Sequence, residues 1–337
     1  MLLGKDSTTG TAAYHRAAYG VIMGAEWAAD RRLACSHCEQ VRMQKECSVH
    51  IVSDSGMDMY LPQNEMPDHD IPIVRHTISL NQKNYRSGVD ISAEELYNKL
   101  AATSSFPTTS QPSAGDFAEL FRKLAATDPD ILCVNMSSGL SGTYNAAKLA
   151  AGMVPEAHVT VFDSKTLSGV VGWEVAAAAR AAKAGWTKEQ IVTMLEKIAD
   201  ASNTIYTLND LKYLIHGGRI SHMKGLIASV LHLRPLIGVT KSNGVYEQLG
   251  QARTFDAALK GLVDVIKRSH VPGTALRAQV LHAGNPDGAA TLRDLVDRVF
   301  TCTWLPVGAI SPVLGAHTGP SLVGIAYAAL ADYPSVP

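Results

Sequence analysis

The sequence has almost no net charge and no long apolar run. Lys and Arg together number 30 and Asp and Glu 31 among 337 residues, so the formal net charge at pH 7 is −1. A nucleic-acid-binding protein usually carries a basic excess, and this balance argues against such a partner. No apolar stretch approaches the roughly 20 residues that a membrane-spanning helix needs. The first residues also lack the basic, apolar and small-residue regions of a signal peptide, and we expect a cytoplasmic protein.

Cysteine is scarce, and its distribution is uneven. Of five cysteines, three lie in "CSHCEQVRMQKEC" as Cys35, Cys38 and Cys47. A C-x-x-C pair with a third cysteine can begin a zinc site or a redox pair, but structural zinc normally has four ligands. The fourth would have to be His37 or His50. The alternative is a set of reduced thiols in a polar extension, and we predict neither a metal nor a cofactor.

The chain lacks the usual catalytic signatures. Residues 137–144, "SSGLSGTY", follow the apolar run "DILCVNM" and look like a phosphate-binding turn. A Walker motif requires a lysine after its last glycine, but Thr143 and Tyr144 follow Gly142 here. The turn also fails the Gly-x-Ser-x-Gly pattern of a nucleophile elbow. No acid pair and no HExxH motif supplies another centre.

Hydroxyl groups gather instead in two loops, "FPTTSQPS" (106–113) and "SSGLSGTY". Both loops precede predicted helices, whose first backbone N–H groups lack partners within the helix and bind anions. Ser and Thr are also preferred helix caps, so capping alone is the alternative. From the residues alone, the two loops indicate a neutral anion pocket whose anion is undetermined.

The length of the chain allows two lobes, because single cores stop growing near roughly 250–300 residues. Strands such as "ILCVNM" and "HVTVFD" alternate with helices and lack polar alternation, which favours a parallel sheet covered on both faces. The small-residue helix in "SGVVGWEVAAAARAAKAG" would approach that sheet closely. Beyond about Ala201 the pattern changes: "LRPLIGVTKSNGVYEQLGQAR" predicts a hairpin around Asn-Gly, and short strands are expected around "AISPVLGAHTGPSLVGIAY".

These patterns predict an α/β protein in three segments. Residues 1–49 form an N-terminal extension. Residues 50–203 form a lobe with a parallel, Rossmann-like sheet, and residues 204–337 form a lobe with a mixed sheet.

Several motifs together resemble one family. The succession "IVSDSGMDM", "TTSQPS", "SSGLSGTYNAA", "VFDSKTLSGVVG", "LKYLIHGGRIS", "RPLIGV" and "HTGP" is similar to the DegV family, which includes the fatty acid-binding B subunits of bacterial fatty acid kinase. The similarity runs from about His50 to Tyr327. The family's opening TDS is here Ser53-Asp54-Ser55. Its HTGPG ends here in Ser321, which replaces a glycine where the backbone φ and ψ are expected to be unusual.

The resemblance implies a DegV-like fold with a tunnel between two lobes that holds one long-chain fatty acid. Such a protein is not an enzyme on its own. It presents the acyl carboxylate to an ATP-binding fatty acid kinase subunit, which forms acyl phosphate for phospholipid metabolism. Transient contact with a membrane surface would allow lipid exchange.

The resemblance also implies roles for particular residues. Thr109 and Ser138 would bind the carboxylate, supported by Ser110 and Ser137, and His317 would lie close by with Thr318 and Gly319 of the same motif. Arg219 would serve phosphotransfer at the partner surface, and His282 occupies a recurrent family position. Apolar residues of "GLIASVLHL" would line the tunnel or belong to the ordinary core: Leu226, Ile227, Val230, Leu231 and Leu233.

Other interpretations stay open at this point. Arg219 could pair with Asp210 or with the helix C-terminal carbonyls near Gly217, and His317 could be an ordinary loop residue. A second hypothesis is an independent α/β hydrolase-like enzyme on a small carboxylate or phosphate ester, with Ser138 as nucleophile and His317 as base. A third is a regulatory protein whose bound lipid is structural. Acyl chain length and unsaturation are not readable from the sequence, and we expect a monomer.

Overall fold

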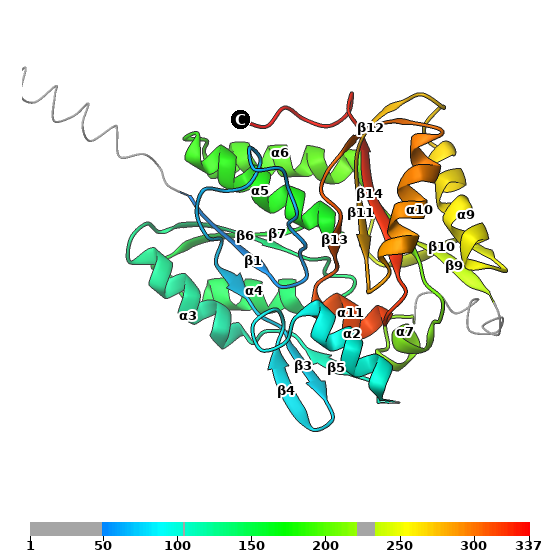
Figure 1. The fold of residues 1–337 in the computed structure, drawn as a ribbon. Coiled ribbons are helices and arrows are strands. Elements are labelled where there is room, and N and C mark those ends of the chain that lie inside the picture. Colours follow the sequence, from blue (N-terminus) through cyan, green and yellow to red (C-terminus); the bar gives the residue numbers. More distant parts are fainter. Residues whose placement is uncertain (1–48, 104, 221–232) are drawn as a thin grey trace, which may run out of the picture. The chain divides into compact units, whose positions relative to one another are not determined.

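The computed structural model describes residues 49–103, 105–220 and 233–337. Cys47–Pro337 form one compact unit. Within it lie a parallel sheet, a larger mixed sheet and a small antiparallel sheet (Figure 1). The three clustered cysteines and the four predicted tunnel residues between 226 and 231 lie outside the described residues.

The first sheet is parallel throughout, with the strand order β2-β1-β6-β7. Its strands are β1 (His50–Asp54), β2 (Ile73–Val74), β6 (Asp130–Asn135) and β7 (His158–Asp163). The strand β6 is almost wholly buried, as predicted for a sheet covered on both faces. The strand β7 lies at the edge and is partly exposed, because it pairs with β6 alone.

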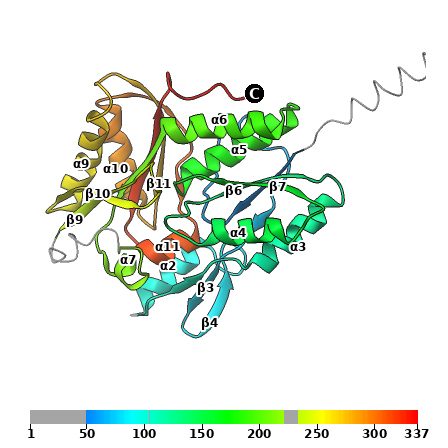
Figure 2. The ribbon, with the colours of Figure 1, turned by 180° about the vertical axis from the view of Figure 1, so that it is seen from behind.

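Helices cover both faces of this sheet (Figure 2). Helices α3 (Ala114–Ala125) and α4 (Thr143–Gly152) pack on one face, and α5 (Gly169–Lys183), backed by α6 (Lys188–Ala201), packs on the other. The segment "SAEELYNKLAA" forms α2 (Ala93–Ala102), which begins at a capping box between Ser92 and Glu95. Such reciprocal bonds satisfy two backbone donors that the helix itself leaves open.

The second sheet is mixed, with the strand order β10-β9-β8-β14-β11-β12 and β13 beside β11. Its strands are β8 (Ser202–Thr207), β9 (Arg234–Val239), β10 (Tyr246–Ala252), β11 (Ala275–His282), β12 (Thr301–Trp304), β13 (Gly308–Ala309) and β14 (Val323–Ala329). The predicted Asn-Gly hairpin is the antiparallel pair β9 and β10. Helices α9 (Phe255–Lys267) and α10 (Pro286–Asp297) lie side by side against this sheet (Figure 1). The predicted α/β class, with a parallel and then a mixed sheet, is therefore confirmed.

The helix α5 lies between the two main sheets. It contacts β1 and β6 of the first sheet and β8 and β14 of the second. Small residues dominate it, and nearly every residue from Gly169 to Ala181 is buried. The expected close approach is thus observed, and it involves both sheets. The lobe boundary placed at residue 203 stays a prediction.

Two elements were not anticipated. The small sheet has the order β4-β3-β5 and consists of β3 (Thr77–Leu80), β4 (Lys83–Arg86) and β5 (Thr108–Ser110). The region expected to hold only short strands near the C-terminus contains a helix, α11 (Pro312–Thr318). Proline at its start has the φ that a first helical turn requires. The motif "HTGP" therefore begins in the last turn of a helix.

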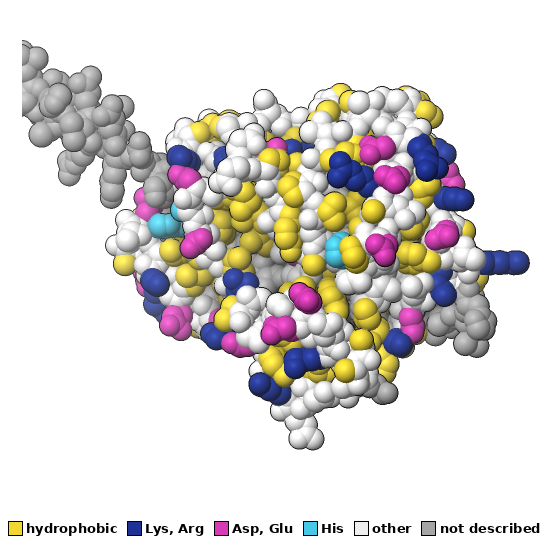
Figure 3. Space-filling model, viewed as in Figure 1, with side chains coloured by type: hydrophobic (Ala, Val, Ile, Leu, Met, Phe, Trp, Pro, Cys, Tyr) yellow, Lys and Arg dark blue, Asp and Glu magenta, His cyan; other side chains and the backbone are white. Residues whose placement is uncertain are grey.

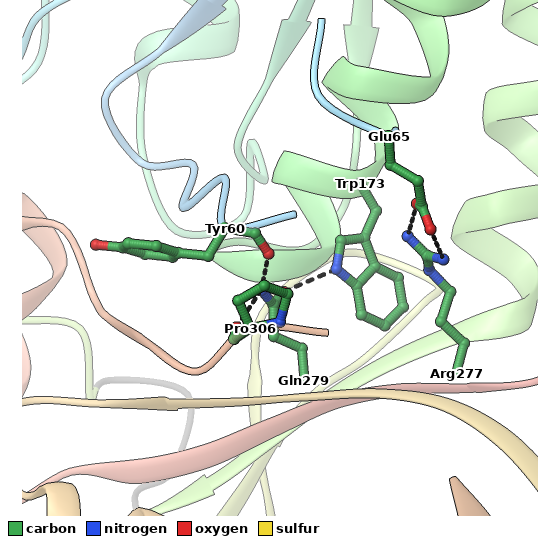
Figure 4. A network of polar contacts seen from close by, with 6 residues as sticks. All are labelled: Tyr60, Glu65, Trp173, Arg277, Gln279 and Pro306. Atoms are coloured by element: carbon green, nitrogen blue, oxygen red, sulfur yellow. Dashed lines mark hydrogen bonds and ion pairs between the residues drawn. The ribbon is translucent and has the colours of Figure 1, made fainter. Parts of the chain in front are cut away.

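A buried polar network ties the loop after β1 to the second sheet (Figure 4). Arg277 on β11 makes two ion-pair contacts with Glu65 and lies 5.0 Å from the ring centres of both Trp173 and Tyr333. The Trp173 indole donates to Gln279 at 2.8 Å. Glu65, Trp173 and Tyr333 come from three different segments, and all three contact side chains of β11. The network therefore fixes α5 and this loop against β11.

The charged side chains of both signs are interspersed on the face shown in Figure 3. This agrees with the near-zero net charge. Among the helices of the described ranges, not one combines the length and the apolar character that crossing a bilayer would take.

Candidate functional site: two adjoining cavities

A polar cavity lies where the small sheet, the turn after β6 and α11 meet. Its polar lining side chains come from five separate segments: His76, Thr109, Gln111, Ser141, Arg219 and His317, together with Tyr246. We call it the head cavity.

The two hydroxyl-rich loops meet at this cavity. Gly142 faces the side chain of Gln111, and a Cβ at position 142 would overlap the Gln111 amide. The helix α4 has Gly142 as its N-cap and no side-chain cap, and Thr109 lies on the strand β5. Capping alone therefore does not explain these hydroxyls, although Ser113 does cap α3.

His317 and Thr109 form a close pair in the cavity wall. The Oγ1 atom of Thr109 lies 2.6 Å from Nε2 of His317. The other ring nitrogen, Nδ1, is buried and has no hydrogen-bond partner within the described ranges, and it packs against Gly217, where a Cβ would overlap it. The first glycine of the "GGRI" motif therefore makes room for the His317 ring.

A second histidine, His76, is buried and also lines the cavity. Its Nδ1 lies 2.9 Å from the Ser55 hydroxyl, and its Nε2 lies 2.9 Å from Oγ1 of Thr143. Oγ1 of Thr143 lies 2.7 Å from the Ser141 hydroxyl, which lines the cavity. Asp54, the last residue of β1, accepts hydrogen bonds from the backbone N–H groups of Gly56 and Met136. These bonds fix the end of β1 beside the cavity wall.

Arg219 brings a cation to the cavity wall, so the pocket is not the neutral one that the hydroxyl-rich loops suggested. Its guanidinium donates to the Gly217 carbonyl at 2.5 Å, one of the alternatives considered from the sequence. Asp210, the other alternative, pairs with Lys212 instead. The sequence could not place Arg219, because its position depends on how the turn after α7 (Lys212–His216) packs against α11.

Burial and charge keep both histidines neutral. Desolvation, with smaller contributions from Arg219 and His76, lowers the pKa of His317 to about 3. Desolvation also lowers the pKa of His76, and Arg219 adds to that effect while Asp54 opposes it. Burial raises the pKa of Tyr246 to about 12. The cavity thus combines one cation with neutral hydrogen-bonding groups.

The serines predicted to contact the carboxylate are arranged differently from the expectation. Ser138 donates to Asp163 at 2.6 Å, and Ser137 is buried and donates to the Gly244 carbonyl at 2.7 Å. Ser110 is exposed on β5. Ser141 is the residue of this turn that lines the head cavity beside Thr109. The proposed Ser138–His317 nucleophile and base are not paired, because each has another partner.

The remaining predicted residues lie around the end of α11. Thr318 is buried, and Gly319 follows it as the C-cap with a φ of 69°. His282 ends β11 and accepts from the Asn285 backbone N–H at 3.2 Å. Ser321 has a φ of 102°. The expectation of an unusual backbone at Ser321 is therefore confirmed.

An apolar cavity adjoins the head cavity. It shares Tyr246 and Leu314 with the head cavity. We call it the tail cavity. Most of its lining is aliphatic, with a few hydroxyls: Leu167, Ser168, Thr204, Ile205, Tyr206, Leu281, Ile310, Thr318, Leu322, Gly324, Ile325 and Ala326. The chemical character of the two linings matches an elongated ligand with one polar end, since its apolar part would leave water.

Sequence reasoning missed His76, Gln111 and Tyr246 as lining residues, whereas Ser141 belongs to one of the two hydroxyl-rich loops. Gln111 lies within the quoted motif "TTSQPS", so that motif was a usable signal. His76 offered none, because a single histidine beside a short strand is common. Tyr246 opens β10 and reaches both cavities only through the folding of the hairpin.

Comparison with known proteins agrees with this geometry. The DegV family model, described as an uncharacterised protein of that family, matches residues 48–330. A DegV domain-containing protein of Streptomyces coelicolor is 36% identical over 279 residues, which cover 82% of this chain and 97% of that protein. One from Deinococcus radiodurans is 30% identical over 281 residues, covering 83% and 96%.

Solved structures agree with these sequence matches. A structure described as fatty acid binding of a DegV family protein from Thermus thermophilus has a TM-score of 0.73 and 28% identity, and covers 84% of this chain and 100% of that one. A hypothetical protein from Thermotoga maritima, described as revealing a fatty acid binding function, has a TM-score of 0.72 and 26% identity, with coverage of 84% and 100%. By sequence and by fold, this chain belongs to the DegV family.

Proposed function

We propose that this chain binds one long-chain fatty acid and presents its carboxylate to an ATP-dependent kinase subunit, which converts it to acyl phosphate. The observation that carries the proposal is the pair of adjoining cavities, one polar and one apolar. The acyl chain would lie in the tail cavity and the carboxylate in the head cavity. Fatty acid binding by the Thermus and Thermotoga relatives supports the choice of ligand.

The two ends of the ligand contribute differently. Each buried methylene is worth about 0.8 kcal/mol, so about fourteen methylenes supply more than 10 kcal/mol before ordering costs. The head cavity then needs only to orient the carboxylate, which Thr109 and Ser141 do with neutral hydroxyl groups. Arg219 lies in the same wall and would attract the carboxylate and the phosphate that arrives from the kinase. The oxygen that attacks the phosphate stays reactive as long as Arg219 does not engage it bidentately.

The ligand is tested by native mass spectrometry of the purified full chain. We expect one bound long-chain fatty acid per protein, released under denaturing conditions and identified from the extract. A protein that carries no lipid, and that takes up none from phosphatidylcholine vesicles doped with palmitate, would rule out the proposal.

The kinase step needs its own experiment. Lipid-loaded chain is mixed with a candidate bacterial fatty acid kinase subunit and ATP, and acyl phosphate is trapped with hydroxylamine as the hydroxamate. Product that requires both proteins supports the proposal. Bound lipid without product, across the kinase subunits of the same genome, would favour a regulatory protein whose lipid is structural.

A further inference from the structure

The hydrogen bonds behind the head cavity form one unbroken chain. It runs from Ser55 through His76 and Thr143 to Ser141, with successive distances of 2.9, 2.9 and 2.7 Å. Ser55, His76 and Thr143 are buried, and of the four residues His76 and Ser141 line the cavity. A buried chain of hydrogen bonds that ends at a ligand cavity can determine whether its last member presents a donor or an acceptor to the ligand.

The partners determine the direction of this chain. The Ser55 hydroxyl oxygen accepts from the His76 backbone N–H at 3.0 Å. The proton of that hydroxyl then has Nδ1 of His76 as its acceptor. A neutral imidazole has one donor and one acceptor nitrogen, so Nε2 carries the proton and donates to Thr143. The Thr143 hydroxyl in turn donates to Ser141, whose own proton is left for the cavity.

The neutral state of His76 is required for this order. A protonated imidazole would donate from both nitrogens, and the Ser55 proton would lose its acceptor. Burial holds His76 neutral, and Arg219 strengthens that effect. The direction of the chain is therefore fixed by the fold and does not depend on the ligand.

A second hydrogen-bonded pair, Thr109 and His317, lines the same cavity. Nε2 of His317 lies 2.6 Å from the Thr109 hydroxyl, and Nδ1 is buried and has no hydrogen-bond partner among the residues that the structure describes. Buried N–H groups without an acceptor are rarer than bare acceptors, so the proton is assigned to Nε2. Nε2 then donates to Thr109, and the Thr109 proton is also left for the cavity.

We propose that His76 is a positioning residue which, through Thr143, turns the Ser141 hydroxyl into a hydrogen-bond donor aimed at the ligand, so that the head cavity selects an ionised carboxylate. The inference rests on the proposed function, since it concerns the same site. An ionised carboxylate only accepts hydrogen bonds and matches two hydroxyl donors, whereas an amide or alcohol head group presents donors of its own.

Thr143→Val tests the chain, because valine has nearly the shape of threonine and lacks the hydroxyl. Thr143→Ser is the matched control, since it keeps the hydroxyl that connects His76 to Ser141. Each full-length protein is loaded with [1-13C]palmitate, and the carboxyl resonance is followed from pH 4 to pH 9. Transfer of the lipid to phosphatidylcholine vesicles gives the dissociation rate.

Losing one donor should raise the pKa of the bound carboxyl group and speed palmitate dissociation about tenfold in Thr143→Val. Thr143→Ser should stay within about twofold of the wild type. If the buried valine prevents folding, Ser141→Ala removes only the terminal donor and should give the same two changes. Equal carboxyl titration in the wild type and in the folded Thr143→Val or Ser141→Ala variant would overturn the inference. A wild-type protein that takes up no palmitate would instead overturn the proposed function.

Discussion

The Thr109 hydroxyl lies 2.6 Å from Nε2 of His317, although 208 residues separate them in the chain. Thr109 belongs to the small sheet and His317 to the last turn of α11. Their meeting joins the loop that contains Thr109 to the C-terminal part of the chain. Both residues line the head cavity.

Gly217→Ala should displace the His317 ring. A Cβ at position 217 would overlap Nδ1 of His317, and the surrounding packing allows little movement. We expect a loss of about 1–3 kcal/mol in the free energy of unfolding and weaker palmitate retention. Gly152→Ala is the control, because no atom lies within 4 Å of the added Cβ. Urea unfolding and lipid occupancy measure both, and equal behaviour of the two variants would contradict the packing argument.

Ser141→Ala and Ser138→Ala should differ in their effect on the ligand. Ser141 lines the head cavity, whereas Ser138 donates to Asp163. Palmitate dissociation should become about tenfold faster in Ser141→Ala, for the loss of one charge-assisted hydrogen bond. It should change little in Ser138→Ala. The opposite result would favour the assignment made from the sequence, in which Ser138 holds the carboxylate.

Arg219→Gln should change both the histidine and the ligand. Arg219 is one of the groups that lower the pKa of His317, so its neutral replacement should raise that pKa, although burial still holds it below its usual value. Palmitate retention should fall, because Arg219 is the only cation among the described residues that line the head cavity. NMR titration of His317 and lipid occupancy provide the two measurements. Arg219→Lys keeps the charge and should lose less of its bound palmitate than Arg219→Gln. Unchanged palmitate retention in Arg219→Gln would mean that Arg219 acts in the phosphotransfer step alone.

Ser321→Gly should be more stable than Ser321→Ala by about 1 kcal/mol. The backbone φ of 102° at this position is unfavourable for any residue with a Cβ. Both variants lose the hydrogen bond from the Asn209 N–H to the Ser321 hydroxyl, so their difference isolates the backbone contribution. Thermal and urea unfolding give the comparison, and equal stabilities would mean that the turn relaxes in Ser321→Ala.

Asp58→Asn should remove a pH dependence of stability. Burial raises the pKa of Asp58 from 3.8 to about 7, against hydrogen bonds from Ser168 and from the Ser311 N–H. The folded protein therefore holds this proton more tightly than the unfolded chain does. The resulting stability is present in full below about pH 4 and is lost as the pH rises through about 7.

Ionisation of Asp58 should lower the free energy of unfolding by on the order of 4 kcal/mol between about pH 4 and pH 7. The effect is measured as the wild-type free energy of unfolding minus that of Asp58→Asn, from pH 4 to pH 8. The difference should fall as the pH rises, because Asp58 becomes charged in the wild type. Asparagine keeps hydrogen-bonding capacity and stays neutral at every pH. A difference that stays constant over this range would show that Asp58 is ionised in the folded protein.

Local sequence patterns predicted much of the secondary structure. The Ser92–Glu95 capping box and the Asn-Gly hairpin depend on residues close together in the chain, so they were readable without the fold. The helix α11 was missed, because "SPVLGAHTGP" contains two glycines and two prolines and is too short for a helical period. Tertiary packing of α11 against α2 and α7 stabilises it instead.

The sequence by itself determined the alternation of strands and helices, the change to a mixed sheet and the resemblance to the DegV family. It also pointed to two loops and to His317. Only the tertiary structure decided that Ser141 rather than Ser138 lines the head cavity, that His76 is connected to Ser141, and that Arg219 belongs to the cavity wall. The reason is physical: adjacent residues of a turn point in different directions, and long-range hydrogen bonds select among them only when distant strands and helices have packed.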